Sequence, residues 1–165
     1  MKKVICLLFA VSIFSLTKAQ YTIRCGNQTF NISAKKISSI KQVDPQTKAI
    51  TITTCYYQLD NDRLKVWMET GDSLTRSFSL YEIKKDAIDQ NASQQIVDYD
   101  QQDYTEPVKT LYIKCVADKK DVSVTSYVDW TNNADKFPWS FIYVSSYNKS
   151  ELENMLNEIN NWLKQ

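Results

Sequence analysis

The feature that most constrains the fold is a period of two in the apolar residues of the first half of the chain. From 49 to 59, even positions (isoleucine, threonine, tyrosine) alternate with odd ones (threonine, Cys55, Tyr57). From 64 to 70, Leu64, Val66 and Met68 alternate with other residue types. Successive side chains of a strand point to opposite faces of a sheet, so both segments are predicted to be half-buried strands. Turn signals at 60–62 and 71–72 predict a meander of hairpins.

Further strands and one helix are predicted along the rest of the chain. The strands are expected over 21–33, 74–83, 108–117, 122–130 and 139–145. A segment rich in Asp and Gln, 84–107, is predicted to be a long loop. Helical spacing of Leu152, Met155, Leu156, Ile159, Trp162 and Leu163 predicts an amphipathic helix, which Asn148 or Ser150 can cap.

These elements together predict a mainly β (α+β) fold. About seven antiparallel strands would form either a barrel or a two-sheet sandwich, and the C-terminal amphipathic helix would cap it. Core packing is the favoured role of the helix, because its polar face carries more glutamates than lysines and so does not suit a membrane surface.

The N-terminal residues predict export. Lys2 and Lys3 precede an apolar run over 4–16, and small residues then lead to a cleavage point after Ala19. Residues 1–19 are therefore predicted to be a signal peptide, and residues 20–165 a single β-rich domain. The run is too short to span a bilayer, which takes about 20 residues, so a membrane anchor is the less favoured alternative. The expected location is periplasmic or extracellular, with no integral membrane segment after cleavage.

Composition excludes several classes of function. The chain has no His, which rules out Ser-His-Asp and Cys-His sites and imidazole-based zinc sites. It has only two glycines, Gly26 and Gly71, so no glycine-rich phosphate loop is present. Cleavage would remove three lysines and no acids, leaving 17 basic against 19 acidic residues and a net charge of −2. No cofactor and no nucleic-acid partner are predicted.

Three cysteines remain after the predicted cleavage. By alternation, Cys25 and Cys115 share strand faces with apolar residues, whereas Cys55 falls with threonines. We therefore predict a disulfide between Cys25 and Cys115, as an exported protein permits. Three reduced, packed thiols are an equally supported alternative, since sequence alone does not fix connectivity.

Aromatic residues are the candidate binding surface. Tyr57, Trp67 and Tyr112 oppose the apparent core face, and Phe137 and Trp139 precede the last strand. Exposed aromatic side chains stack on sugars or anchor protein partners. The favoured alternative is that a second layer buries some of them.

Catalytic and metal sites have weaker signals. Carboxylates near strand ends would permit glycoside hydrolysis, and a Ser–Lys pair would permit nucleophilic catalysis, but no motif singles out any residue. Acidic residues of the long loop begin like a calcium site but lack its turn glycine and terminal glutamate. No catalytic, cofactor-binding or metal-ligating residue is assigned, and an enzyme is the less favoured reading.

The order of elements resembles the pleckstrin-homology-like superfold: a meander, then further strands, then a final helix with a tryptophan, here Trp162. The resemblance covers most of 21–165 and implies binding of phosphoinositides or peptides. The lysines between the first two strands lack the tight basic pattern that phosphoinositide binding needs (Lys35, Lys36, Lys41 and Lys48). A lipocalin-like barrel is the nearest rival, but Gly26 is not followed by its Gly-x-Trp motif.

The sequence predicts a non-catalytic exported module that binds a protein, a glycan or a small ligand. A small secreted hydrolase and a structural envelope or surface component are the alternatives. Four Asn-x-Ser/Thr sequons would accept glycans in a eukaryotic secretory pathway (Asn27, Asn31, Asn91 and Asn148). The lysine-rich start looks bacterial, in which case the sequons are incidental.

Overall fold

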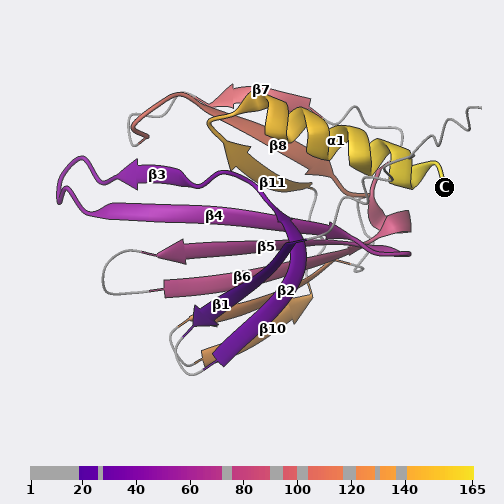
Figure 1. Ribbon diagram of the computed structural model, residues 1–165, viewed down its shortest axis with the longest axis horizontal. Helices are drawn as coiled ribbons and strands as arrows, with labels where there is room; N and C mark the ends of the chain where they lie inside the picture. Colours follow the sequence, from indigo (N-terminus) through magenta and orange to yellow (C-terminus); the bar gives the residue numbers. More distant parts are fainter. Residues whose placement is uncertain are drawn as a thin grey trace, which may run out of the picture.

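Two antiparallel β-sheets and one C-terminal helix make up the described part of the protein (Figure 1). The computed structural model describes residues 19–25, 28–71, 76–89, 95–99, 104–116, 122–128, 131–136 and 141–165. The predicted mainly β class with a helical cap is confirmed, in its two-sheet form. Within the described residues the longer sheet runs from one edge strand to another without closing into a barrel.

The longer sheet has eight strands. In spatial order seven of them are β1 (Ala19–Cys25), β2 (Gln28–Lys36), β4 (Ile50–Leu59), β5 (Arg63–Gly71), β6 (Arg76–Lys84), β9 (Val122–Val128) and β10 (Thr131–Lys136), and β3 (Ile40–Val43) pairs with β4. The shorter sheet has the order β11 (Phe141–Ser146), β8 (Val108–Lys114) and β7 (Gln95–Tyr99). A 3-10 turn, η1 (Lys85–Ala87), follows β6, and α1 (Lys149–Leu163) follows β11.

The observed elements differ from the predicted ones at the first hairpin and at two edge strands. The predicted strand over 21–33 is a hairpin of β1 and β2, with Cys25 opposite Gln28. The predicted loop over 84–107 contains η1 and the edge strand β7. Another edge strand, β10, includes 132–135, which reads as a turn in sequence. Backbone pairing suffices for such edges, so the apolar alternation that marks a strand is missing there.

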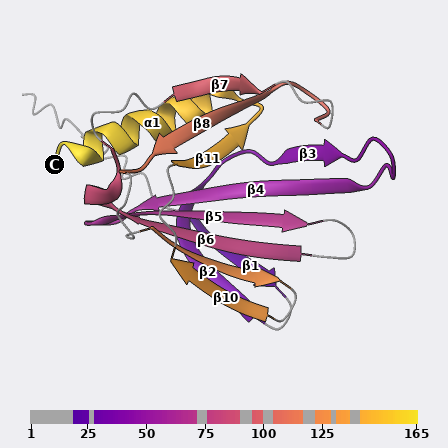
Figure 2. The ribbon, with the colours of Figure 1, turned by 180° about the vertical axis from the view of Figure 1, so that it is seen from behind.

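Both faces of the central strands β4, β5 and β6 are buried. The first core covers one face and includes Cys55, Tyr57, Leu64, Val66 and Ile83. In Figures 1 and 2, the shorter sheet and α1 lie together on one side of these strands, and the β1–β2 hairpin lies on the other. The central sheet is therefore the middle layer of the molecule.

The second core lies beneath the β1–β2 hairpin. Tyr56, Trp67 and Phe78 of the central strands pack there against β1 and β2, which contribute Ile23, Ile32 and Ala34. Strand β2 pairs with β4 at only two positions, Lys35 with Tyr57 and Lys36 with Tyr56. The rest of the hairpin is thus free to leave the plane of the sheet and cover this face.

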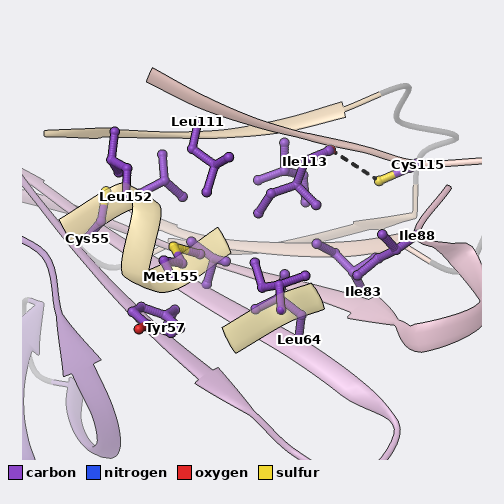
Figure 3. Close-up of a cluster of buried hydrophobic side chains, with 14 of the residues drawn as sticks. Cys55, Tyr57, Leu64, Ile83, Ile88, Leu111, Ile113, Cys115, Leu152 and Met155 are labelled. Carbon is purple, nitrogen blue, oxygen red and sulfur yellow. Dashed lines mark hydrogen bonds between the residues drawn. The ribbon is translucent and has the colours of Figure 1, made fainter. Parts of the chain in front are cut away.

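The helix α1 contributes to the first core together with the shorter sheet and the central strands. Its apolar stripe is buried, with Leu152, Met155 and Ile159 fully inaccessible to solvent. Figure 3 shows Leu152 and Met155 beside Leu111 and Ile113 of β8. At its C-terminal end, the Trp162 indole Nε1 donates a 2.7 Å hydrogen bond to the Asp60 carbonyl. The burial of the apolar stripe and this hydrogen bond together hold α1 against the rest of the protein.

The partly buried carboxylate of Glu151 anchors the first turn of α1, whose N-cap is Asn148. Glu151 accepts hydrogen bonds from the Ser38 backbone N (3.0 Å), the Ser38 Oγ (2.6 Å) and the Ser146 Oγ (2.8 Å). Partial burial raises the pKa of Glu151, but these hydrogen bonds outweigh that effect, and the net pKa lies below its usual value. The charged carboxylate therefore links α1 to the segment between β2 and β3.

Glu151→Gln is expected to lower the free energy of unfolding at pH 7 by about 1 kcal/mol, because the amide accepts weaker hydrogen bonds than the carboxylate. A carboxyl group whose pKa is depressed in the folded state stabilises it fully above the unfolded pKa, which is about 4.3. That contribution is lost as pH falls through the lower folded pKa, so the difference between wild type and variant should shrink below about pH 4. Urea unfolding at several pH values measures it.

Glu153→Gln is the matched control, since Glu153 is exposed and, among the described residues, its ion pair is with Lys149 across one turn of α1 at 3.2 Å. It should cost no more than about 0.5 kcal/mol at pH 7. Equal losses for the two variants would contradict the linking role of Glu151.

Candidate functional site: a groove between the two sheets

A groove separates β11 from the first face of the central strands. Its main cavity holds about 250 Å³ and is lined by Ile40, Gln42, Thr53, Cys55, Met68, Thr70, Tyr104, Tyr143 and Ser145. A smaller cavity of about 110 Å³ is lined by Met68, Tyr81, Phe141, Ile142 and Tyr143. The two cavities share Met68 and Tyr143 and are therefore neighbours, and we call them together the interlayer groove.

The alternation of β11 positions the groove. Ile142 and Val144 point to the first core and are buried. Phe141, Tyr143 and Ser145 alternate with them and lie on the other face of the strand. Phe141 is 44% exposed and Tyr143 is 53% exposed, which is unusual for large aromatic side chains. The helix fills the core side of β11, and the groove occupies the opposite side.

Neutral polar groups line the interior of the groove. The hydroxyls of Thr53 and Thr70 lie 3.2 Å apart, and the Ser145 hydroxyl lies 2.9 Å from that of Thr110. A β-bridge between Gln42 and Tyr104 places these two residues side by side at the β3 end. No carboxylate, ammonium or guanidinium group is among the described residues that line either cavity.

Burial favours the neutral forms of Cys55 and Tyr81 in the groove. Burial raises the pKa of the Cys55 thiol to about 12, against the smaller opposing effect of a backbone hydrogen bond from Ser145. Burial also raises the pKa of Tyr81, with the neighbouring Tyr143 and Cys55 as further causes. A thiol that stays protonated is a poor nucleophile, so Cys55 here is a packing residue.

The structure separates the aromatic residues that the sequence grouped as a binding surface. Tyr57 and Trp67 are only 5% and 6% exposed and belong to the first and second cores, so their rings are not the exposed aromatic surface that the sequence predicts. Tyr57 and Trp67 are thus buried by a second layer, as the alternative interpretation of the sequence expected, because both faces of the central sheet are covered. Tyr112 is half-buried, and its ring centroid lies 5.3 Å from that of Phe141.

The other two candidates, Phe137 and Trp139, lie outside the described residues. Sequence reasoning missed Phe141 and Tyr143, which the structure leaves exposed. The signal was present in their alternation with Ile142 and Val144. Alternation predicts which residues share a face, but it does not predict which face of a strand is covered.

Of the predicted Cys25–Cys115 disulfide, the structure describes only the Cys115 side chain. Cys115 is a free, buried thiol in the first core, 3.8 Å from the Ile113 carbonyl oxygen (Figure 3). Strand β1, which contains Cys25, pairs with β2, and its Ile23 belongs to the second core on the far face of the central sheet. The side chain of Cys25 lies outside the described residues. Apolar alternation alone does not tell which of the two apolar cores a cysteine faces, so the Cys25–Cys115 pairing stays a prediction.

Other site classes find no support in the described part of the chain. No group of three or more Cys, Asp or Glu side chains is arranged there to hold a metal ion. No helix in this part has the length and apolar character needed to cross a membrane. Of the sequons, Asn31 and Asn148 are exposed, and Asn27 and Asn91 lie outside the described residues.

Comparisons with models of protein families, with curated proteins and with solved structures found no match to this chain. The pleckstrin-homology-like resemblance therefore stays an expectation from element order. Function has to be argued from the geometry of the groove itself.

Proposed function

We propose that the protein is an exported, non-catalytic binding module that takes a small, uncharged, partly aromatic or aliphatic ligand in the interlayer groove. The observation that carries the proposal is the groove's combination of exposed aromatic rings at Phe141 and Tyr143 with neutral hydroxyl groups inside. Export rests on the signal-peptide pattern of residues 1–19.

The chemistry of the walls favours an amphiphile. The rings of Phe141 and Tyr143 and the thioether of Met68 offer an apolar surface. The threonine and serine hydroxyls of the same lining can donate or accept one or two hydrogen bonds. Such a mixture, mostly apolar with a few polar groups that fix orientation, is typical of small-molecule sites.

The neutrality of the walls disfavours a charged ligand and catalysis. A buried charge without a partner is strongly destabilised, and no described wall residue offers a counter-charge. General acid–base chemistry needs a group with a pKa near the working pH, whereas burial holds the pKa of Cys55 at about 12. A binding module therefore explains the groove better than a hydrolase does.

A groove-filling substitution tests the proposal. The probe is 2-naphthol, an uncharged fluorescent aromatic alcohol, titrated by fluorescence and checked by equilibrium dialysis. Thr70→Phe places a ring in the main cavity and is expected to weaken binding at least tenfold. Thr29→Phe makes the same change at an exposed position of β2 and should leave binding unchanged.

Tyr143→Ala is a second variant that tests the site independently, in case Thr70→Phe impairs folding. Its side chain is 53% exposed, so its loss should affect stability little while weakening 2-naphthol binding about tenfold. The proposal is overturned if the wild-type protein does not bind the probe, or if it binds equally well after Thr70→Phe and Tyr143→Ala.

A further inference from the structure

A second groove lies between the polar face of α1 and the start of the chain's first hairpin. It holds about 540 Å³ and is lined by Ala19, Tyr21, Ala34, Lys35, Lys36, Ile37, Tyr57, Glu151, Asn154, Asn157, Glu158 and Asn161. We call it the helix–hairpin groove. It shares no lining residue with the interlayer groove, and its volume falls within the roughly 300–1,000 Å³ that is typical of ligand sites.

Three asparagines form one wall of this groove. Asn154, Asn157 and Asn161 recur at the i, i+3, i+7 spacing that brings side chains to one face of a helix. All three are exposed. Within the described part of the chain, none of their carboxamides is engaged in a hydrogen bond to another residue. Three free carboxamides, about one turn apart, thus face the same space.

The charged groups at the base of the groove are already paired. Lys35 Nζ lies 2.5 Å from Glu158 Oε1, and the Tyr57 hydroxyl donates to Glu158 Oε2 at 3.1 Å. Glu151 accepts from Ser38 and Ser146, as described above. The lining has two lysines and two glutamates, so its formal charges cancel. An uncharged ligand suits such a site, because binding it displaces none of these pairs.

The free groups match a ligand with many hydroxyls. A carboxamide offers one acceptor oxygen and two N–H donors, and a hydroxyl both donates and accepts, so adjacent hydroxyls can pair with both ends of one asparagine. Tyr21 supplies an aromatic wall from β1, where its ring is half-buried with its centroid 5.0 Å from that of Tyr56. The C–H face of a sugar ring packs on such a surface.

We propose that the helix–hairpin groove is a second binding site, specific for neutral carbohydrate. Asn154, Asn157 and Asn161 bind the hydroxyl groups, and Tyr21 packs against the ring. The ammonium group of Lys36, which is exposed at the rim, adds a further donor. An extended peptide is the competing ligand class, but peptide grooves combine backbone pairing with pockets for alternate side chains. An aromatic wall together with a row of carboxamides fits sugar better.

Isothermal titration with neutral trisaccharides tests the proposal. The probes are maltotriose, cellotriose, mannotriose and N,N′,N″-triacetylchitotriose, with a Gly-Ser hexapeptide as the competing ligand. At least one trisaccharide is expected to bind, and Asn157→Ala is expected to weaken that binding about tenfold. Alanine is the better helix former, so the substitution does not endanger α1.

Asn160→Ala is the matched control. It makes the same change on the same helix at a position that does not line the groove, and it should leave binding unchanged. Thr70→Phe should also leave trisaccharide binding unchanged, which separates this site from the interlayer groove. The proposal is overturned if no trisaccharide binds, if Asn157→Ala and Asn160→Ala bind equally, or if only the hexapeptide binds.

Discussion

Phe78→Ala is expected to lower the free energy of unfolding by about 3–5 kcal/mol, the range for deleting a fully buried aromatic ring. Phe78 is 1% exposed in the second core, and its ring stacks on that of Phe30 with centroids 4.7 Å apart. The substitution would leave a cavity between the central sheet and the β1–β2 hairpin. Because β2 pairs with β4 at only two positions, this packing is the main attachment of the hairpin to that face.

Phe141→Ala is the matched control, since Phe141 is 44% exposed on β11. It should cost less than about 1 kcal/mol. Urea unfolding of both variants, followed by tryptophan fluorescence and circular dichroism, measures the difference. If Phe78→Ala cost no more than Phe141→Ala, the second core would not exist as described.

Met155→Ala is expected to lower the free energy of unfolding by about 2–5 kcal/mol. Met155 is fully buried in the first core, where α1 meets β8 and the central strands (Figure 3). Loss of its side chain removes contacts with both sheets at once. The helix carries little stability of its own at 15 residues, so its docking depends on this packing.

Leu156→Ala on the same helix is the control for Met155→Ala. Leu156 is only partly buried at the edge of the first core, so its truncation should cost clearly less. Alanine has high helix propensity in both variants, and propensity therefore does not explain a difference between them. Equal losses of stability for the two variants would contradict the packing of α1 into the first core through Met155.

Local periodicity predicted the central strands and the helix. The alternation in β4 and β5 and the apolar stripe of α1 correctly placed these elements, but the prediction that the strands are half-buried was wrong, because both of their faces are covered. The same reasoning does not find β7 or β10, because the apolar residues of β7 (Ile96 and Val97) are adjacent rather than alternating and β10 is almost entirely polar.

The burial of Trp67 depends on partners far away in sequence. A strand's own pattern does not say whether its second face meets solvent or another layer, and here β1 and β2 cover that face. The Cys25–Cys115 pairing stays a prediction, since two apolar cores look alike in sequence and the side chain of Cys25 lies outside the described residues. Candidate sites are harder still: the Asn154, Asn157 and Asn161 spacing is visible in the chain, but only the fold brings Tyr21 opposite it.

Methyl NMR offers the most direct test of the interlayer groove. Isoleucine, methionine and threonine residues with methyl groups line the groove, for example Ile40, Met68 and Thr70. Met155 of α1 lies instead in the first core. Titration with 2-naphthol is expected to shift the methyl signals of Ile40, Met68 and Thr70 in a saturable way and to leave Met155 unmoved. Shifts confined to methyl groups outside the groove, or no saturable shift at all, would contradict the proposed function.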